Sequence, residues 1–229
     1  MRTAVFDLDG TLADTSADLI AAANAALGEG GFGTPLEAVA DAHTAFRGGR
    51  AMLRAGLARL PAPDGGADAV IEALYPRLLE HYRTGLCRET RLYPGVEAAL
   101  DRLAAEDWIL AVCTNKPVAL AEALLAELGI APRFRATLGA DSLPVRKPDP
   151  QHLFETIARA GGRPEGAVLI GDTETDRETA RRAGLPCILV GFGPEGAGVA
   201  RLAPEAMLAR YDDLPGLLEA MIPRRRRAG

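Results

Sequence analysis

Two aspartates separated by one residue, Asp7 and Asp9, stand in the run DLDGTLADT near the start of the chain. Ionised carboxylates held this close repel one another, so both stay charged only beside a positive charge. A bound divalent cation meets that requirement. A pair of surface aspartates in a turn is the alternative interpretation, and Gly10, which follows them, favours a turning chain.

Three later runs hold polar residues that suit a phosphate group and a cation. Thr114 and Asn115 follow an apolar run, and a hydroxyl with backbone amides at a helix start can bind phosphate oxygens. Asp172 opens an acidic run that ends at Asp176, and another carboxylate would complete an oxygen-rich magnesium site. Lys147 in VRKPDP could neutralise a phosphoryl group during transfer. Taken singly, each also fits a bland role as a helix cap, a solvated loop charge or a helix-start acid.

Short apolar runs bounded by turn residues alternate along the chain with helical patterns. This alternation predicts an α/β fold with a doubly wound parallel sheet covered on both faces. Ligands of such a sheet bind beyond the carboxyl ends of its strands, where the candidate residues would gather. The predicted strands are Thr3–Leu8, Trp108–Cys113, Ala167–Ile170 and Cys187–Val190.

The segment from residue 15 to residue 89 shows only helical patterns, which predicts a helical unit inserted after the first strand. The sheet domain is therefore expected to be discontinuous, with residues 1–14 and 90–229. Glycines that follow helical patterns predict helix ends at Gly85, Gly129 and Gly184. One inserted helix is expected to begin with an N-cap, a first-turn proline and a capping-box acid, which are Thr34, Pro35 and Glu37.

The 229 residues carry a formal net charge of −5 at pH 7, with a pI near 5.3. Binding a nucleic-acid backbone needs a basic face that releases counterions, so no nucleic-acid partner is expected. No apolar run approaches the roughly 20 residues that span a bilayer, and no signal-peptide layout is present, which predicts a cytoplasmic protein without membrane contact. The three cysteines lack paired spacing and are expected to be buried free thiols. The run Arg224–Arg227 is expected to be a solvated tail.

The four polar runs together resemble the motifs of the haloacid dehalogenase-like hydrolases, in the order found in that family. The matching residues are Asp7–Thr11 (DLDGT), Thr114, Lys147 followed by Pro148, and Gly171–Asp176 (GDTETD). The match spans nearly the whole chain. The insertion point resembles that of members with a small helical (C1-type) cap, and the runs CTNKP and KPDP are most similar to phosphoglycolate phosphatases.

This resemblance implies a Mg²⁺-dependent phosphatase that forms an aspartyl-phosphate on Asp7. Asp9 would protonate the leaving alcohol and then deprotonate the water that releases phosphate. The metal would be held by the Asp7 carboxylate, the main-chain carbonyl of Asp9 and Asp172. The substrate would be a small phosphorylated metabolite such as 2-phosphoglycolate.

The resemblance also assigns roles around the phosphoryl group. Thr114 and Asn115 would bind its oxygens, Lys147 would neutralise its charge, and Asp176 would orient Lys147 or a metal-bound water. In the inserted unit, we expect Arg47 or Arg50 to contact the non-reacting end of the substrate by a charge-assisted bond, with a solvated loop arginine as the alternative.

Other activities remain open at this stage. The same fold could serve a sugar-phosphate phosphatase, a pyrophosphatase, a phosphosugar mutase or a catalytically silent binding protein. The protein is expected to be a monomer or a homodimer. A dehalogenase is disfavoured because Asp9 supplies an acid that halide displacement does not need. The glycines of GFGPEG, at 191, 193 and 196, are interpreted as a loop because a lone GxGxxG pattern is weak.

Overall fold

The protein is described by a computed structural model that covers residues 1–62, 65–193 and 195–224. The chain divides into two compact units, one of Met1–Leu12 with Leu92–Gly229 and the other of Ala13–Arg91. Residue 194 of the glycine-rich loop and residues 225–227 of the arginine run lie outside the described residues.

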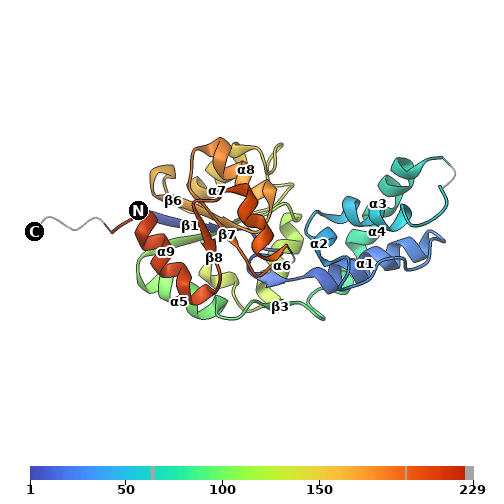
Figure 1. Ribbon diagram of the computed structural model, residues 1–229, viewed down its shortest axis with the longest axis horizontal. Helices are drawn as coiled ribbons and strands as arrows, with labels where there is room; N and C mark the ends of the chain where they lie inside the picture. Colours follow the sequence, from blue (N-terminus) through green and yellow to red (C-terminus); the bar gives the residue numbers. More distant parts are fainter. Residues whose placement is uncertain (63–64, 194, 225–229) are drawn as a thin grey trace, which may run out of the picture. The chain divides into compact units, whose positions relative to one another are not determined.

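One parallel sheet organises the first unit, and over the described residues its strand order is β5-β4-β1-β6-β7-β8 (Figure 1). The chain runs outward from β1 through β4 to β5 and then returns to β6 on the other side of β1. The strand order therefore reverses at β1, and this reversal is where such sheets bind their ligands. The strands are β1 (Arg2–Phe6), β4 (Trp108–Cys113), β5 (Ala136–Leu138), β6 (Ala167–Gly171), β7 (Cys187–Val190) and β8 (Ala206–Leu208).

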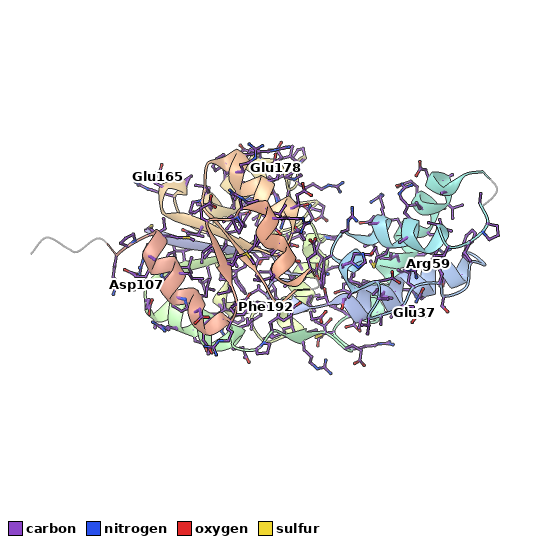
Figure 2. All side chains as sticks on the ribbon, viewed as in Figure 1. Glu37, Arg59, Asp107, Glu165, Glu178 and Phe192 are labelled. Atoms are coloured by element: carbon purple, nitrogen blue, oxygen red, sulfur yellow. The ribbon has the colours of Figure 1, made fainter. Side chains whose placement is uncertain are left out.

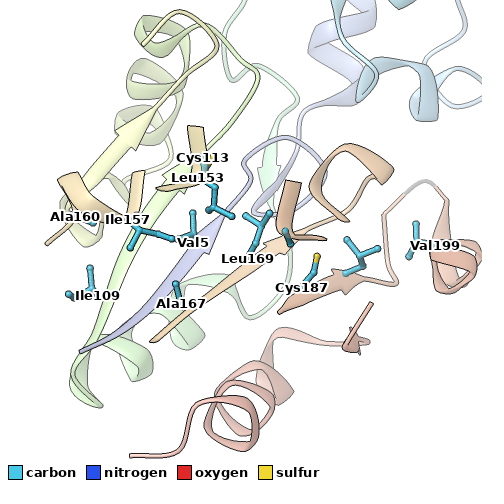
Figure 3. Packing of buried hydrophobic residues seen from close by; sticks show 13 residues of the cluster. Val5, Ile109, Cys113, Leu153, Ile157, Ala160, Ala167, Leu169, Cys187 and Val199 are labelled. Carbon is cyan, nitrogen blue, oxygen red and sulfur yellow. The ribbon is translucent and has the colours of Figure 1, made fainter. Parts of the chain in front are cut away.

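Helices cover both faces of this sheet, which confirms the predicted doubly wound fold. On one face, Val5, Leu153 and Leu169 pack in an apolar cluster (Figure 3). Helix α7 contributes Leu153 to this cluster and α8 contributes Ala180. Helices α5 and α9 lie on the opposite face (Figure 1). The helices of this unit are α5 (Val96–Ala105), α6 (Val118–Glu127), α7 (Pro150–Arg159), α8 (Glu174–Ala183) and α9 (Leu214–Met221).

The predicted strands and helix ends of this unit agree with the structure, with two omissions. Gly129 follows α6 with φ +71°, and Gly184 follows α8 with φ +67°, the left-handed backbone that favours glycine. Strands β5 and β8 were not predicted, because each has only three residues and is partly exposed. Such short edge strands are recognised by their pairing and not by an apolar run.

The second unit is helical, with α1 (Ser16–Glu29), α2 (Ala42–Ala45), α3 (Gly49–Leu57) and α4 (Ala67–Thr84). Helix α1 packs against both α3 and α4. Asp18 of α1 is buried and accepts hydrogen bonds from the backbone N–H of Glu89 and Thr90 and from the Thr90 hydroxyl at 2.7–3.1 Å. Two short strands at the ends of this unit, β2 (Ala13–Asp14) and β3 (Arg91–Leu92), pair with each other.

The expected helix start at Thr34, Pro35 and Glu37 is wrong, because these residues form no helix. The side-chain amide of Asn24 occupies both backbone groups of Leu36, at 2.8 and 3.0 Å, and Asp41 accepts the N–H of Glu37 at 2.7 Å. Backbone groups held by side chains are unavailable to a helix. Arg59, which is labelled in Figure 2, completes the turn by donating to Pro35 O and to the Asp41 carboxylate.

Cys113 and Cys187 are buried free thiols as expected, whereas Cys87 is only half-buried. A bilayer-spanning helix is absent from the described part of the chain, since no helix there combines sufficient length with an apolar composition.

Candidate active site

The carboxyl ends of the three central strands bring together residues that are far apart in sequence. Asp7 follows β1, and its N–H donates to the carbonyl of Ile170 at the end of β6 at 2.8 Å. Asp172 follows β6 directly. Thr114 follows β4, and its N–H donates to Leu138 O of β5 at 3.0 Å. The parallel register therefore places all three residues at the edge where the strand order reverses.

Lys147 lies between the two acids Asp7 and Asp176. Its Nζ is 3.0 Å from Asp7 Oδ1 and 2.6 Å from Asp176 Oδ1, and its side chain is 1% exposed. Burial opposes the charged form of Lys147, but the Asp176 and Asp7 carboxylates outweigh it and raise the pKa of the ammonium above its ordinary value. Lys147 therefore remains a fixed positive charge beside Asp7.

Asp176 is fully buried, and both of its carboxylate oxygens are occupied. Oδ1 accepts from Lys147, while Oδ2 accepts from the N–H of Asp172 and from the N–H and hydroxyl of Thr173. Gly171 makes this packing possible, because a Cβ there would lie 2.3 Å from Asp176 Cγ. Thr173 caps α8, and the reciprocal bonds between Thr173 and Asp176 form a capping box. Asp176 thus ties α8, the end of β6 and Lys147 together.

Burial dominates the electrostatics of Asp7 and Asp172. It raises the pKa of Asp7 to about 6, against the opposing effect of the Lys147 ammonium. Burial and the neighbouring Asp176 and Asp7 carboxylates raise the pKa of Asp172 well above its ordinary range. Keeping the Asp7 and Asp172 carboxylates ionised this close together therefore costs free energy, and a nearby cation would lower that cost.

Two residues that were not singled out from the sequence join the site. Lys116 Nζ donates to both carboxylate oxygens of Asp9, at 2.7 and 2.9 Å. The hydroxyl of Thr11 donates to Asp172 Oδ1 at 2.9 Å. Both residues lie in the runs that carry the other candidates, but a sequence pattern does not show which way a loop side chain points.

Thr114 and Asn115 occupy the loop between β4 and α6. Thr114 is buried, and its hydroxyl accepts the N–H of Lys116 at 3.2 Å. The side-chain amide of Asn115 donates to the carbonyl of Lys147 at 3.0 Å. Asn115 therefore fixes the Lys147 loop against the loop after β4.

The residues present fit a hard divalent cation. Carboxylate oxygens of Asp7, Asp172 and Asp176 lie within 4.8 Å of one another, and oxygen ligands are those that Mg²⁺ prefers. Asp7 Oδ1 is buried and accepts no hydrogen bond from the described residues, although the Lys147 ammonium lies 3.0 Å away as an ion-pair partner. When ionised, the cluster has two more negative than positive charges, from Asp7, Asp9, Asp172 and Asp176 against Lys116 and Lys147.

Arg47 and Arg50 belong to the helical unit. Arg47 is exposed in the turn between α2 and α3. Arg50 forms two hydrogen bonds to Glu72, at 2.7 and 2.8 Å, and its guanidinium carbon lies 3.7 Å from the ring centroid of Tyr75. Arg50 is therefore already held within its own unit.

Comparison with known proteins gives concordant matches. The family model described as haloacid dehalogenase-like hydrolase matches residues 1–184. Phosphoglycolate phosphatase from Mesorhizobium japonicum is 40% identical over 216 residues, covering 92% of this chain and 91% of the relative. Phosphoglycolate phosphatase from Cereibacter sphaeroides ATCC 17029 is 38% identical over 223 residues, covering 97% of this chain and all of the relative. A crystal structure from Haemophilus somnus 129PT, described as a predicted phosphoglycolate phosphatase, superposes with a TM-score of 0.82 at 25% identity, covering 95% and 97% of the two chains.

Proposed function

The chain belongs to the haloacid dehalogenase-like hydrolases and is a phosphoric monoester hydrolase, and we propose that its substrate is 2-phosphoglycolate. The observation that carries phosphoryl transfer is the buried Asp7 carboxylate, one oxygen of which accepts no hydrogen bond from the described residues, beside the fixed positive charge of Lys147. The relatives named phosphoglycolate phosphatase, which match almost the whole chain, support the choice of substrate.

In the first chemical step, a carboxylate oxygen of Asp7 attacks phosphorus while the bond from phosphorus to the ester oxygen breaks. The carboxyl group of Asp9 gives its proton to that oxygen, so glycolate leaves as an alcohol. In the second step, Asp9 takes a proton from water, the water oxygen attacks the aspartyl-phosphate, and phosphate is released with Asp7 regenerated.

The surrounding residues hold these groups in place. Lys147 neutralises charge on the phosphoryl group and on Asp7, and Asp176 keeps Lys147 oriented through the 2.6 Å contact. Thr114 binds a phosphoryl oxygen with its hydroxyl and Asn115 binds one with its backbone N–H, since the Thr114 N–H already donates to Leu138 O. Fixed donors around a phosphoryl group lower the barrier because they need no rearrangement as charge develops.

Mg²⁺ would be held by the carboxylates of Asp7 and Asp172 and by the main-chain carbonyl of Asp9. Asp176 is unsuited to direct coordination, because Lys147 and three other donors already occupy its oxygens. When bound, Mg²⁺ supplies positive charge to the transferring phosphoryl oxygens. Thr11 orients Asp172 through its hydroxyl.

The helical unit, Ala13–Arg91, serves as the cap in this proposal. Arg47 or Arg50 contacts the substrate carboxylate, and Arg47 is the better candidate because Glu72 and Tyr75 already engage Arg50. Replacing each arginine with alanine should raise KM more for 2-phosphoglycolate than for a neutral phosphate ester. Equal effects on both substrates would rule out this contact.

The decisive experiment is a substrate panel with Mg²⁺, comparing the native protein with Asp7→Asn. The panel contains 2-phosphoglycolate, glucose 6-phosphate, β-glucose 1-phosphate, pyrophosphate and a 2-haloacid. We expect the highest kcat/KM with 2-phosphoglycolate and no measurable turnover by Asp7→Asn. A folded Asp7→Asn variant that retained turnover would exclude Asp7 as the nucleophile.

Metal binding is tested without turnover by the effect of Mg²⁺ on thermal unfolding. A ligand that binds only the folded state stabilises it by about 2.7 kcal/mol at one hundred times its Kd. Mg²⁺ should therefore raise the Tm of the native protein, and Asp172→Asn should weaken this response. An identical Mg²⁺ response in the two proteins would place the metal elsewhere.

A further inference from the structure

Lys116 lies in the loop after β4, and its ammonium contacts both carboxylate oxygens of Asp9 at 2.7 and 2.9 Å. Resting on the proposed role of Asp9, we propose that Lys116 is a positioning residue that holds this carboxyl group for proton exchange with the leaving oxygen and with water. The lysine side chain is 3% exposed and the aspartate side chain 17% exposed, so the ammonium is buried and the Asp9 carboxylate is the more accessible of the two to solvent.

The backbone of Lys116 is fixed on both sides. Its N–H donates to the Thr114 hydroxyl at 3.2 Å, and its carbonyl accepts the N–H of Ala140 at 3.0 Å. Gly139 permits this approach, because a Cβ there would lie 2.5 Å from the Lys116 carbonyl oxygen and 2.3 Å from the N–H nitrogen of Val118. The loop after β5 thus holds the loop after β4, and the lysine side chain extends from a rigid base.

The two lysines of the site serve different acids. Lys147 contacts Asp7 and Asp176, whereas Lys116 contacts Asp9. An ammonium that meets both oxygens of one carboxylate fixes its position, and a general acid works only within hydrogen-bond reach of the atom it protonates. Each of the two reacting carboxyl groups therefore has its own buried cation.

The amino-acid composition supports a requirement for an ammonium at this position. The chain contains 26 lysines and arginines, and the only two lysines among them are Lys116 and Lys147. A compact ammonium and a broad planar guanidinium differ in shape and in donor geometry, so they are not interchangeable in a close-packed site. A chain that otherwise uses arginine throughout has lysine only at the two positions that contact the reacting aspartates.

Three phosphate esters separate this role from the others that Lys116 could have. 2-Phosphoglycolate and ethyl phosphate both release a poor alkoxide leaving group that needs a proton, and only the first has a carboxylate. 4-Nitrophenyl phosphate releases a stable phenolate that leaves without protonation. For Lys116→Met we expect kcat/KM to fall on the order of 10²-fold for both alkyl esters, at the lower end of the range for general acids, and to change little for the aryl ester.

Two other patterns of kcat/KM across the three esters would overturn the proposal. A fall with 2-phosphoglycolate alone would mean that Lys116 recognises the substrate carboxylate, and an equal fall with all three esters would mean phosphoryl binding or a general structural role. Lys116→Met should add no further loss in an Asp9→Asn background, and independent losses would also refute action through Asp9. Lys116→Arg should be as impaired as Lys116→Met, and full activity in the arginine variant would contradict the need for an ammonium.

A spectroscopic test needs neither turnover nor a folded Lys116 variant. Protein labelled at lysine side chains should give two Nζ signals, since the chain has two lysines. Asp9→Asn should shift the Lys116 signal and leave the Lys147 signal almost unchanged. Asp7→Asn should shift the Lys147 signal and leave the Lys116 signal almost unchanged. An unchanged Lys116 signal in Asp9→Asn would show that Lys116 does not contact Asp9, which would refute the proposal. If the native protein hydrolyses 2-phosphoglycolate no faster than ethyl phosphate, the proposed substrate fails, while the Lys116 test still stands on ethyl phosphate and on the spectra.

Discussion

Replacing Asp176 with asparagine tests whether this buried carboxylate stabilises the site by joining Lys147 to the end of β6. One carboxylate oxygen accepts from Lys147 at 2.6 Å, and the other accepts from three donors on Asp172 and Thr173. An asparagine side chain has only one oxygen. Whichever way it is oriented, its NH₂ group faces donors, so a buried donor loses its partner.

The magnitude follows from the burial of both partners. Removing one member of a buried ion pair costs about 3–5 kcal/mol. Lys147 keeps Asp7 at 3.0 Å, so we expect the lower end of this range for Asp176→Asn. In a domain of this size, 1 kcal/mol corresponds to roughly 2–4 °C in Tm, which gives a fall of about 6–12 °C.

Glu174→Gln is the matched control, because Glu174 is an acid in the same first turn of α8 but is exposed. Its loss should cost only the helix-dipole contribution of about 0.3–1 kcal/mol. Both variants are measured by differential scanning calorimetry without Mg²⁺. If Asp176→Asn melts no lower than Glu174→Gln, the buried contacts of Asp176 do not stabilise the fold and the reasoning is wrong.

Three further predictions concern stability. Gly171→Ala should destabilise the protein by about 1–3 kcal/mol, since its Cβ would lie 2.3 Å from Asp176 Cγ; an unchanged denaturant midpoint would contradict this close packing. Burial lowers the pKa of His152 from its ordinary 6.5, so the unfolded chain binds a proton that the folded protein excludes. The free energy of unfolding should therefore fall as pH drops below about 6.5, more steeply in the native protein than in His152→Gln. Parallel curves of this free energy against pH for the two proteins would refute a contribution from His152. Asp18→Asn should lower the stability of the helical unit by about 1.5–3 kcal/mol, because three donors lose a charged acceptor; urea unfolding followed by circular dichroism measures it, and no change would count against these bonds.

The amino-acid sequence by itself determined the fold class and the principal acids of the site. Apolar runs such as Trp108–Cys113 can be buried on both faces only in a covered parallel sheet, and this follows from the runs and the helical patterns between them. Because parallel strands present their carboxyl ends at one edge, the placement of Asp7 and Asp172 directly after two strands was enough to predict that they meet.

Local signals failed where another segment supplied the deciding contact. The sequence of Thr34 and Pro35 favours a helix start, but Asn24 and Asp41 hold the neighbouring backbone in another conformation. Strand β8 exists because it pairs with β7, and its three residues have no distinct pattern of their own.

The tertiary structure alone decided which cation meets which acid. Lys116 and Asp9 are 107 positions apart, and Thr11 and Asp172 are 161 apart. All four lie outside the helices and strands of the fold, where no periodicity fixes the direction of a side chain. Their contacts depend on the register of neighbouring strands and on close approaches such as that of Gly139 to the loop of Lys116, which exist only once the sheet has formed.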